Sequence, residues 1–217
     1  MIFPHGGKIN LAPFYVRAAP FAAFILFLAI FPGWPLLRGL VTAALLAVFW
    51  RHYTELRQSR LSTRETAIAI AAGAAVFLAW IALDQPWARL GGEGAGYSPL
   101  TAEGGIDWPR ALARIAVLAA VVPVMEELFW RSFLMRWIDS RDFLNLDARK
   151  VSGMAVALTT GLFAVEHSLW VAGLMAGLAY AGLYMTTNNL RAPVLAHAVT
   201  NAILGLWILT TGSWHLW

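Results

Sequence analysis

The sequence predicts an all-α membrane protein: a polytopic bundle of about seven transmembrane helices around a central polar cavity. The first observation is composition, because 59% of the 217 residues are hydrophobic and only 13% are charged, whereas soluble domains carry about 25% charged residues. The second is a series of apolar stretches of the length that a helix needs to cross a bilayer. The third is a small set of polar side chains at helical spacing within the later stretches. We expect residues 1–217 to form a single membrane domain.

Three apolar stretches precede the middle of the chain, at residues 14–31, 36–50 and 66–83. The first is long enough to span a bilayer and no A-x-A cleavage site follows it, so we expect a membrane helix and not a cleaved signal peptide. The segment 51–65, between the second and third stretches, is polar and basic. Small residues in the third stretch favour close packing against neighbouring helices.

Four further stretches follow a glycine-rich, acidic loop at residues 84–110. We expect them to form spans at residues 111–138, 151–170, 171–185 and 193–211. The first of these exceeds the roughly 20 residues that a straight span needs, so it is predicted to be tilted or bent. Pro123 lies within it and lacks the N–H that would close the preceding turn, which predicts a bend at this point.

The distribution of basic residues predicts the orientation. The loops after the second and fourth spans hold most of the arginine and lysine residues, and Lys8 and Arg17 lie near the amino terminus. Under the positive-inside rule, the amino terminus is therefore expected in the cytoplasm and the carboxy terminus outside. The chain has no cysteine, which excludes disulfides and thiolate chemistry. It also carries no nucleic-acid-binding motif and no phosphate-binding loop.

The most unusual stretch is VVPVMEELFWRSFLMRWI, at residues 121–138. It places Glu126, Glu127 and Arg131 in an apolar helix, where a charge costs at least a few kcal/mol unless it has a partner or a wet cavity. Glu127 and Arg131 are four residues apart on one helix face, whereas Glu126 points about 100° away from Glu127. One acid is thus expected to be neutralised by the arginine and the other to remain free for chemistry. The alternative is a helix end at the membrane surface, with all three groups in water.

Two later spans carry polar groups that can complete a site with these acids. The sequence FAVEH places His167 near the end of the fifth span, and HAVTN places His197 and Asn201 on one face of the seventh. A carboxylate with a nearby imidazole can take a proton from water, and a second imidazole with an amide can donate hydrogen bonds to an oxygen that gains negative charge. This set supports amide hydrolysis without a serine or cysteine nucleophile. Glu166 is expected at the membrane interface.

Level, straight helices would keep the two histidines apart. At about 1.5 Å per residue, His167 lies about 24 Å along the fifth predicted span, whereas His197 lies near the start of the seventh. The pattern therefore requires that the fifth helix starts deeper than hydropathy suggests, or that the helices tilt strongly. The membrane face to which the cavity opens stays undetermined at this stage.

The motifs EExxxR, FxxxH and HxxxN occur in this order over residues 121–204. This order resembles the CPBP family of intramembrane proteases, which includes the type II CAAX prenyl endopeptidases and bacteriocin-processing relatives. The first half of the chain is similar only in being helical and apolar. The resemblance implies an integral protein of the bacterial inner membrane that uses no cofactor. It would cut a hydrophobic or lipidated peptide next to membrane lipid, and it would bind no nucleic acid.

The resemblance also implies a role for each polar residue. Glu126 would be the general base that activates water with the help of His167, while His197 and Asn201 would stabilise the oxyanion.

Glu127 and Arg131 would shape the site or position the substrate. Ser132 is one departure from the family pattern, because members often have glycine there; its small side chain predicts tolerance. The stretch ELFWRSFLMRWI also resembles a bacterial subgroup linked to exosortase-type protein sorting.

Three alternatives stay open. His167, His197 and a glutamate could hold zinc with a water in the fourth position, although the sequence contains no H-E-x-x-H motif. The chain could instead be a non-catalytic CPBP-like membrane scaffold or a bacteriocin-immunity protein, in which the polar cluster is structural. A small transporter that uses the acids as a proton relay ranks last, because the sequence shows no repeated halves. The sequence does not indicate which peptide is the substrate, whether it is prenylated, or the oligomeric state.

Overall fold

The computed structural model describes residues 12–57, 60–91 and 96–217. Lys8, which contributes to the orientation argument, lies outside the described residues. Within them the chain is helical, and the one β pairing there is an isolated antiparallel bridge between Leu100 and Ile106. The all-α prediction is confirmed.

Seven helical rods follow one another within the described residues. The first three are α1 (Ala12–Ile30), α2 (Pro35–Phe49) and α3 (Thr63–Ala82). The fourth rod, here called the long helix, is continuous over residues 108–139. It comprises α4 (Trp108–Ala116), the π-helical η4 (Val117–Val121), α5 (Val122–Glu127), the π-helical η5 (Leu128–Leu134) and α6 (Met135–Asp139). The last three are α7 (Gly153–Val165), α8 (Trp170–Thr187) and α9 (Arg191–Thr211).

Short 3-10 turns lie in the connections between the rods and after the last one. They are η1 (Trp50–His52), η2 (Thr54–Arg57), η3 (Pro86–Ala88), η6 (Phe143–Asn145), η7 (Ala148–Lys150) and η8 (Trp214–Leu216).

Two helix boundaries differ from the sequence prediction for identifiable reasons. α3 begins at Thr63, three residues early, because Ser62 and Glu65 form a capping box that satisfies backbone N–H groups at its start. α7 ends at Val165 instead of continuing to residue 170. The polar residues that follow Val165 form a turn before α8 begins. This early end takes His167 off the helix and into the interior of the bundle.

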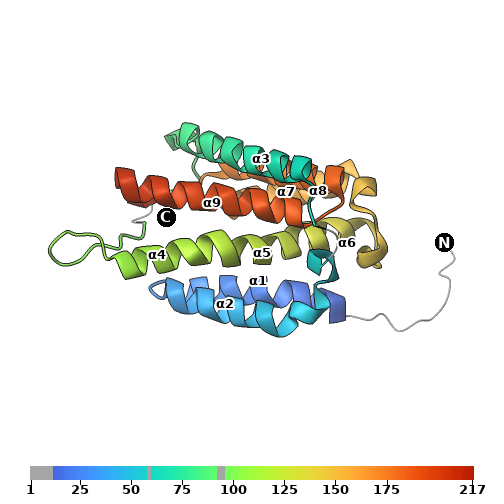
Figure 1. Cartoon of the computed structure of the whole chain (residues 1–217), viewed down its shortest axis with the longest axis horizontal. Coiled ribbons are helices and arrows are strands. Elements are labelled where there is room, and N and C mark those ends of the chain that lie inside the picture. The colour runs from blue at the N-terminus through green and yellow to red at the C-terminus, as the bar shows by residue number, and fades with distance from the viewer. Residues whose placement is uncertain (1–11, 58–59, 92–95) are drawn as a thin grey trace.

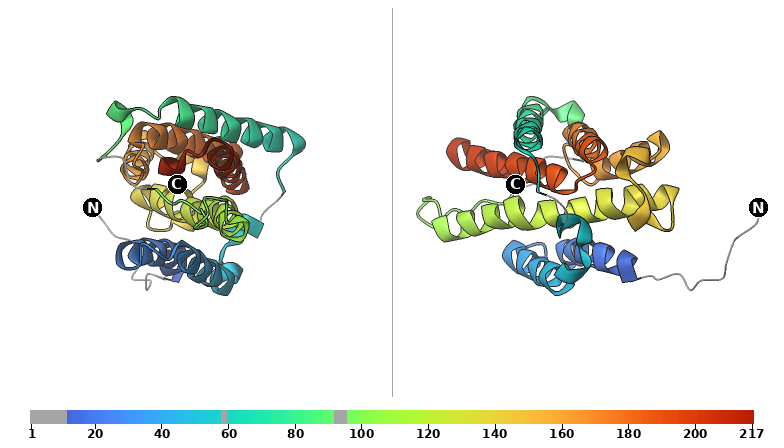
Figure 2. Two further views of the ribbon diagram at one scale, coloured as in Figure 1. Left: turned by 90° about the vertical axis from the view of Figure 1, so that its left-hand side faces the viewer. Right: turned by 45° about the vertical axis from the view of Figure 1, so that its right-hand side comes forward.

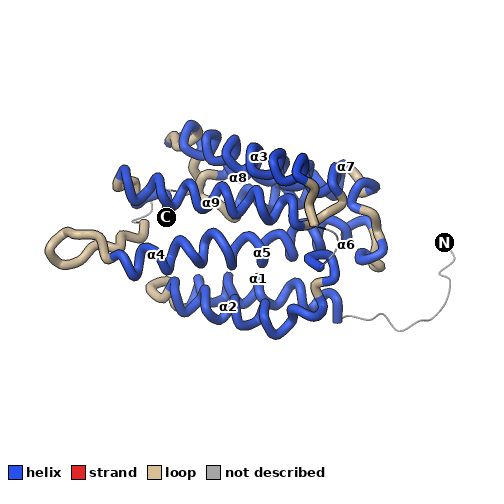
Figure 3. Tube along the Cα trace, viewed as in Figure 1, coloured by secondary structure: helices blue, strands red, loops and turns tan. Residues whose placement is uncertain are grey.

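The helices form layers around the long helix. α1 and α2 lie side by side along one face, the long helix crosses the middle, and α3 lies on the opposite face (Figure 1). α9 packs against both α3 and the long helix, while α7 and α8 pack as a pair (Figure 2). Because consecutive rods are antiparallel, their connections gather at two ends of the bundle (Figure 3). The basic end comprises the start of α1 and residues 50–57, 60–62, 140–152 and 188–190. The opposite end comprises residues 31–34, 83–91, 96–107, 166–169 and 212–217.

The surface of the bundle is typical of a polytopic membrane protein. By length and composition, α1, α3 and α9 can each cross a membrane, and α7 is a shorter apolar helix. Large apolar side chains such as Leu40, Val48 and Leu78 are exposed on the outer faces of the helices. Contiguous apolar surface of this kind is rare on soluble monomers, so it fits contact with lipid.

α3 approaches α9 closely at Gly73. A Cβ atom added there would lie 2.3 Å from the carbonyl oxygen of Ala196, so only glycine allows the two backbones to meet. The carbonyl of Gly73 accepts a hydrogen bond of 2.9 Å from Oγ1 of Thr200. This contact fixes the face of α9 that carries Thr200 and, by helical spacing, His197.

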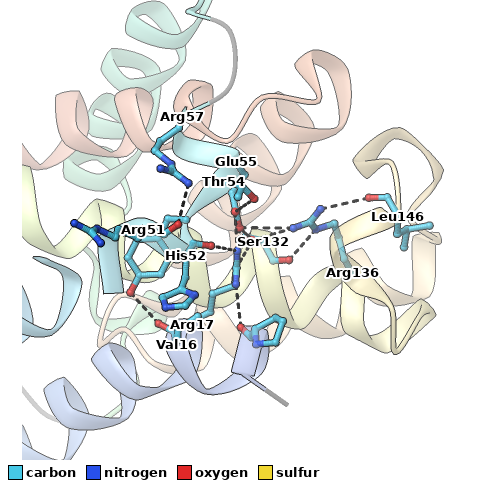
Figure 4. Close-up of polar contacts among 12 residues, drawn as sticks. Val16, Arg17, Arg51, His52, Thr54, Glu55, Arg57, Ser132, Arg136 and Leu146 are labelled. Carbon is cyan, nitrogen blue, oxygen red and sulfur yellow. Dashed lines mark hydrogen bonds and ion pairs between the residues drawn. The ribbon is translucent and has the colours of Figure 1, made fainter. Parts of the chain in front are cut away.

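A buried polar network joins α1 to the long helix at the basic end (Figure 4). Glu55 accepts hydrogen bonds of 2.8 and 2.7 Å from the Nε and Nη2 atoms of Arg17, and another from the Ser132 hydroxyl. Arg136 donates to the Ser132 Oγ at 2.9 Å. Burial raises the pKa of the Glu55 carboxyl, but the hydrogen bonds and charge of Arg17, together with the Ser132 hydrogen bond, outweigh it and lower the pKa below its usual range. Ser132 therefore takes part in closing this end of the bundle, and its tolerance in place of glycine stays a prediction.

Candidate active site

A cavity of about 290 Å³ lies inside the bundle, and the polar residues singled out from the sequence meet there. Its walls come from α1, α3, the long helix, α8, α9, the turn after α7 and the carboxy-terminal segment. Glu126, His167, His197 and Asn201 all line it. The network at the basic end contributes no lining residue. The predicted cavity thus exists, and it extends from the middle of the long helix towards the opposite end.

Glu127 lies behind the cavity wall, and Arg131 and His197 contact its carboxylate. Its carboxylate forms the predicted ion pair with Arg131, with Oε2 and Nε 3.2 Å apart and Oε1 accepting from Nη1 at 3.2 Å. Oε1 also faces Nδ1 of His197 at 3.0 Å. Arg131 is held by the Gly177 carbonyl at 3.3 Å and by the Phe163 ring, whose centroid lies 4.3 Å from its Cζ. These contacts balance a carboxylate that is 0% exposed, so Glu127 is held by its partners and is not free for chemistry.

Glu126 is the acid that faces the cavity. It is buried, and its Oε2 has no hydrogen-bond partner among the described residues. The nearest basic group is Nε2 of His197, at 4.0 Å from Oε2. The turn of about 100° between adjacent helical residues thus separates a paired acid from an unpaired one.

His197 is oriented from three sides. Its Nδ1 faces Glu127, so Nε2 points towards Glu126 and the cavity. Its ring stacks on Tyr180 with centroids 4.9 Å apart and planes at 18°. The Tyr180 hydroxyl donates to Thr200 at 2.8 Å, and Thr200 in turn donates to the Gly73 carbonyl. This chain of contacts fixes the imidazole through α8, α9 and α3.

His167 lies in the turn after α7, and Phe163 positions it. The Phe163 carbonyl, one helical turn earlier, lies 2.8 Å from Nδ1 of His167. Because a carbonyl can only accept, Nδ1 carries the proton and Nε2 is the nitrogen left for the cavity. Trp80 of α3 packs edge-on against the imidazole, with centroids 5.4 Å apart. In FxxxH, the phenylalanine therefore contributes its carbonyl to the histidine and its ring to Arg131.

The two histidines line the same cavity because the helices are not level. α7 begins farther out at the basic end than α9 does (Figure 3). It is also only 13 residues long, so its end lies inside the bundle. The assumption that all helices start at one depth, which kept His167 and His197 apart in the sequence argument, is wrong for this pair.

Asn201 is held by a carbonyl that Pro123 leaves free. In the π-helical η4, the N–H of Val122 donates to the Val117 carbonyl five residues back. The next bond in this register would run from residue 123 to Leu118, but proline has no N–H. The side-chain amide of Asn201 donates to the Leu118 carbonyl instead, at 2.8 Å. One amide hydrogen of Asn201 is used in this bond and the other stays available to the cavity.

Sequence reasoning missed several residues of the site. Tyr180 and Thr200 were not singled out. The signal that could have indicated them was a polar side chain within an apolar span. Glu166, expected at the interface, is half-buried and lines the cavity beside His167. Arg114 also lines the cavity although the sequence analysis gave it no role.

The described part of the chain contains no group of three or more His, Asp or Glu side chains arranged to hold a metal ion. Although Glu126 and His197 lie near each other, His167 is held by the Phe163 carbonyl and Glu127 is taken up by Arg131. The expectation that no cofactor is needed remains a prediction.

The family described as type II CAAX prenyl endopeptidase Rce1-like matches residues 108–203. This range runs from the start of α4 into α9 and contains EExxxR, FxxxH and HxxxN complete. Over this range, the match supports a CPBP-family intramembrane protease. No curated protein and no solved structure matches the chain significantly. The match and the helices that are able to cross a bilayer together support an integral membrane protein. The resemblance drawn from the three motifs is confirmed.

Proposed function

We propose that the protein is an intramembrane glutamate-type endopeptidase that cuts a membrane-associated peptide with activated water. One observation carries this proposal: Glu126 has no protein partner for Oε2 and lines a cavity with two imidazoles and an amide. Its neighbour Glu127 is ion-paired with Arg131 and contacts His197, and it does not line the cavity, so Glu126 is the acid of the EExxxR motif that is placed to act as a base.

In this mechanism, Glu126 takes a proton from a water molecule while the water oxygen attacks the carbonyl carbon of the peptide. The carbonyl oxygen becomes negatively charged, and Asn201 donates its second amide hydrogen to it. His197 can donate from Nε2 when both of its nitrogens carry protons, and the Glu127 carboxylate at Nδ1 is placed to balance that charge. The proton on Glu126 then passes to the leaving amine, with His167 as the assisting base and acid.

The substrate class follows from the walls of the cavity. Phe24, Leu28 and Leu204 surround the polar centre, so an extended hydrophobic segment fits better than a polar one. We propose a peptide with a hydrophobic or lipidated carboxy-terminal segment as the substrate. Membership of the exosortase-linked subgroup belongs to this proposal too.

Replacing His167 tests the assisting role. We expect His167→Ala to lower kcat by about 10²-fold or more, because a positioned acid or base contributes about 10²–10⁴-fold. The exposed His52 provides the matched control, and His52→Ala should cleave at the wild-type rate. Cleavage of a hydrophobic reporter peptide by purified protein in detergent measures both.

A chelator on the same preparation separates the alternatives. Unchanged cleavage after EDTA treatment supports water activation by Glu126 alone, whereas loss of cleavage that zinc restores would replace it with the zinc mechanism. A wild-type protein that cleaves none of a broad set of hydrophobic peptides would favour the scaffold or immunity-type function.

We also propose that the basic end faces the cytoplasm of a bacterial inner membrane and that the cavity opens to the other side. Four basic residues lie at the opposite end: Arg38, Arg89, Arg110 and Arg114. Ten lie at the basic end: Arg17, Arg51, Arg57, Arg60, Arg64, Arg136, Arg141, Arg149, Lys150 and Arg191. This asymmetry favours a cytoplasmic basic end.

The chain has no cysteine, so single cysteines can report the orientation. In intact cells, a membrane-impermeant maleimide should label Ser98→Cys at the opposite end. It should label Arg149→Cys at the basic end only after the cells are permeabilised. The reverse labelling would show that the cavity opens to the cytoplasm.

A further inference from the structure

The cavity reaches the opposite end of the bundle, and an arginine lies in its wall there. Arg114 comes from α4, three turns before Glu126 on the same long helix. Leu28 of α1 and Trp217 line the cavity with it. Arg114 itself lies about three helical turns from Glu126 and has no part in the mechanism proposed above.

Aromatic rings hold the Arg114 guanidinium, and no carboxylate pairs with it. Its Cζ lies 4.4 Å from the Tyr97 ring centroid and 5.4 Å from that of Trp217. Its Nε is buried without a hydrogen-bond partner, and no acidic side chain of the described residues forms an ion pair with it.

Arg38 adds a second unpaired cation nearby. It is buried, lies over the Phe24 ring at 4.6 Å, and its Nε and Nη1 have no hydrogen-bond partner. α2 packs against α4, and the positive charge of Arg38 acts on Arg114. Two like charges in one apolar region repel each other, so the region attracts an anion.

Three buried arginines elsewhere in the described protein differ from Arg38 and from the half-buried Arg114. Arg17 and Arg136 face Glu55, and Arg131 faces Glu127. The fold therefore supplies a carboxylate wherever a buried arginine is structural. An unpaired buried charge is costly and calls for a ligand or partner.

We propose that Arg114 positions the substrate by binding a carboxylate of the peptide, with Arg38 strengthening the positive potential. This inference rests on the proposed endopeptidase function and specifies its substrate. Arg114 precedes Glu126 by 12 residues in the sequence, which is about 18 Å along a helix. An extended peptide covers about 3.3 Å per residue, so the carboxylate lies about five residues from the cleaved bond.

Paired peptides test the proposal. One hydrophobic peptide carries glutamate about five residues from the cleavage site, and its twin carries glutamine there. With wild-type protein, the glutamate peptide should have a KM about 10-fold or more below that of its twin, because a hydrogen bond to a charged group is worth about 1.5–3 kcal/mol. Arg114→Gln should remove this difference while kcat stays within a few-fold, and Arg114→Lys should keep part of it.

Arg110 provides the matched control, because it lies one turn earlier on α4 and is exposed beside Asp107. Arg110→Gln should keep the wild-type preference. If Arg114→Gln lowers the cleavage of both peptides equally, Arg114 has a structural role and the proposal is overturned. If the effect of Arg114→Gln on cleavage depends on anionic phospholipid in the micelles, and not on the charge of the peptide, then Arg114 binds lipid phosphate instead.

Binding measured without cleavage separates this inference from the proposed function. Fluorescence anisotropy of labelled peptides with the Glu126→Gln protein reports Kd in the absence of turnover. The Glu126→Gln protein should bind the glutamate peptide about 10-fold more tightly than its twin, and this preference should disappear when Arg114→Gln is combined with Glu126→Gln. That result would support the Arg114 site even if the wild-type protein cleaves neither peptide. Equal Kd values for both peptides would overturn the Arg114 site even if both are cleaved.

Discussion

Replacing Glu126 by glutamine should abolish cleavage, with kcat lowered by about 10²–10⁴-fold. Glutamine has nearly the same shape but cannot take the proton from water. The substitution should cost no stability, because Oε2 of Glu126 has no hydrogen-bond partner in the described protein. Among the described residues, the ion-pair contact of Glu126 is with His197 Nε2 at the long distance of 4.0 Å, so removing the buried charge should even raise the unfolding temperature. Parallel measurements of peptide cleavage and of thermal unfolding in the same detergent check both parts.

Glu103 gives the matched control, because it is an exposed acid in the loop before α4. Glu103→Gln should change neither the rate nor the unfolding temperature. Wild-type turnover in Glu126→Gln would remove Glu126 from the mechanism. A rate loss accompanied by a large drop in unfolding temperature would instead assign the residue a structural role.

Local spacing was sufficient to predict the different environments of the two acids. The pair Glu127 and Arg131 is four residues apart on one helix, so its ion pair depends on nothing outside that turn. The same geometry turns Glu126 to another side, and the cavity lies there. Apolar stretches likewise predicted seven helical spans, because a membrane segment must satisfy its backbone hydrogen bonds internally.

The sequence pattern could not predict the contacts between distant segments. The bond from Asn201 to the Leu118 carbonyl depends on a π-helical register followed by Pro123, and hydropathy does not report that register. The hydrogen bond between Arg17 and Glu55 joins residues 38 positions apart, and the segment that carries Glu55 was interpreted only as basic and polar. The early end of α7 was also missed, because hydropathy sets span edges only to within several residues.

Removing the Arg131 charge should destabilise the protein more than any other single change in the site. Arg131→Met leaves the Glu127 carboxylate buried with His197 as its remaining partner, and breaking a buried pair in this way costs about 3–5 kcal/mol. The exposed pair of Arg149 and Asp147 provides the control. Arg149→Met should leave the free energy of unfolding nearly unchanged, because solvent screens an exposed pair. Chemical unfolding in mixed micelles measures the free energy of unfolding for each variant.

A double variant distinguishes the lost charge balance from lost packing. Arg131 also covers the Phe163 ring, so part of its cost is independent of Glu127. If the unpaired carboxylate is the main penalty, Glu127→Gln combined with Arg131→Met should be more stable than Arg131→Met alone. If the double variant is less stable by the sum of the two single effects, then Glu127 and Arg131 act independently. In that case Arg131 would not be what holds Glu127 in place, and the separation of a structural acid from a catalytic one would need another cause.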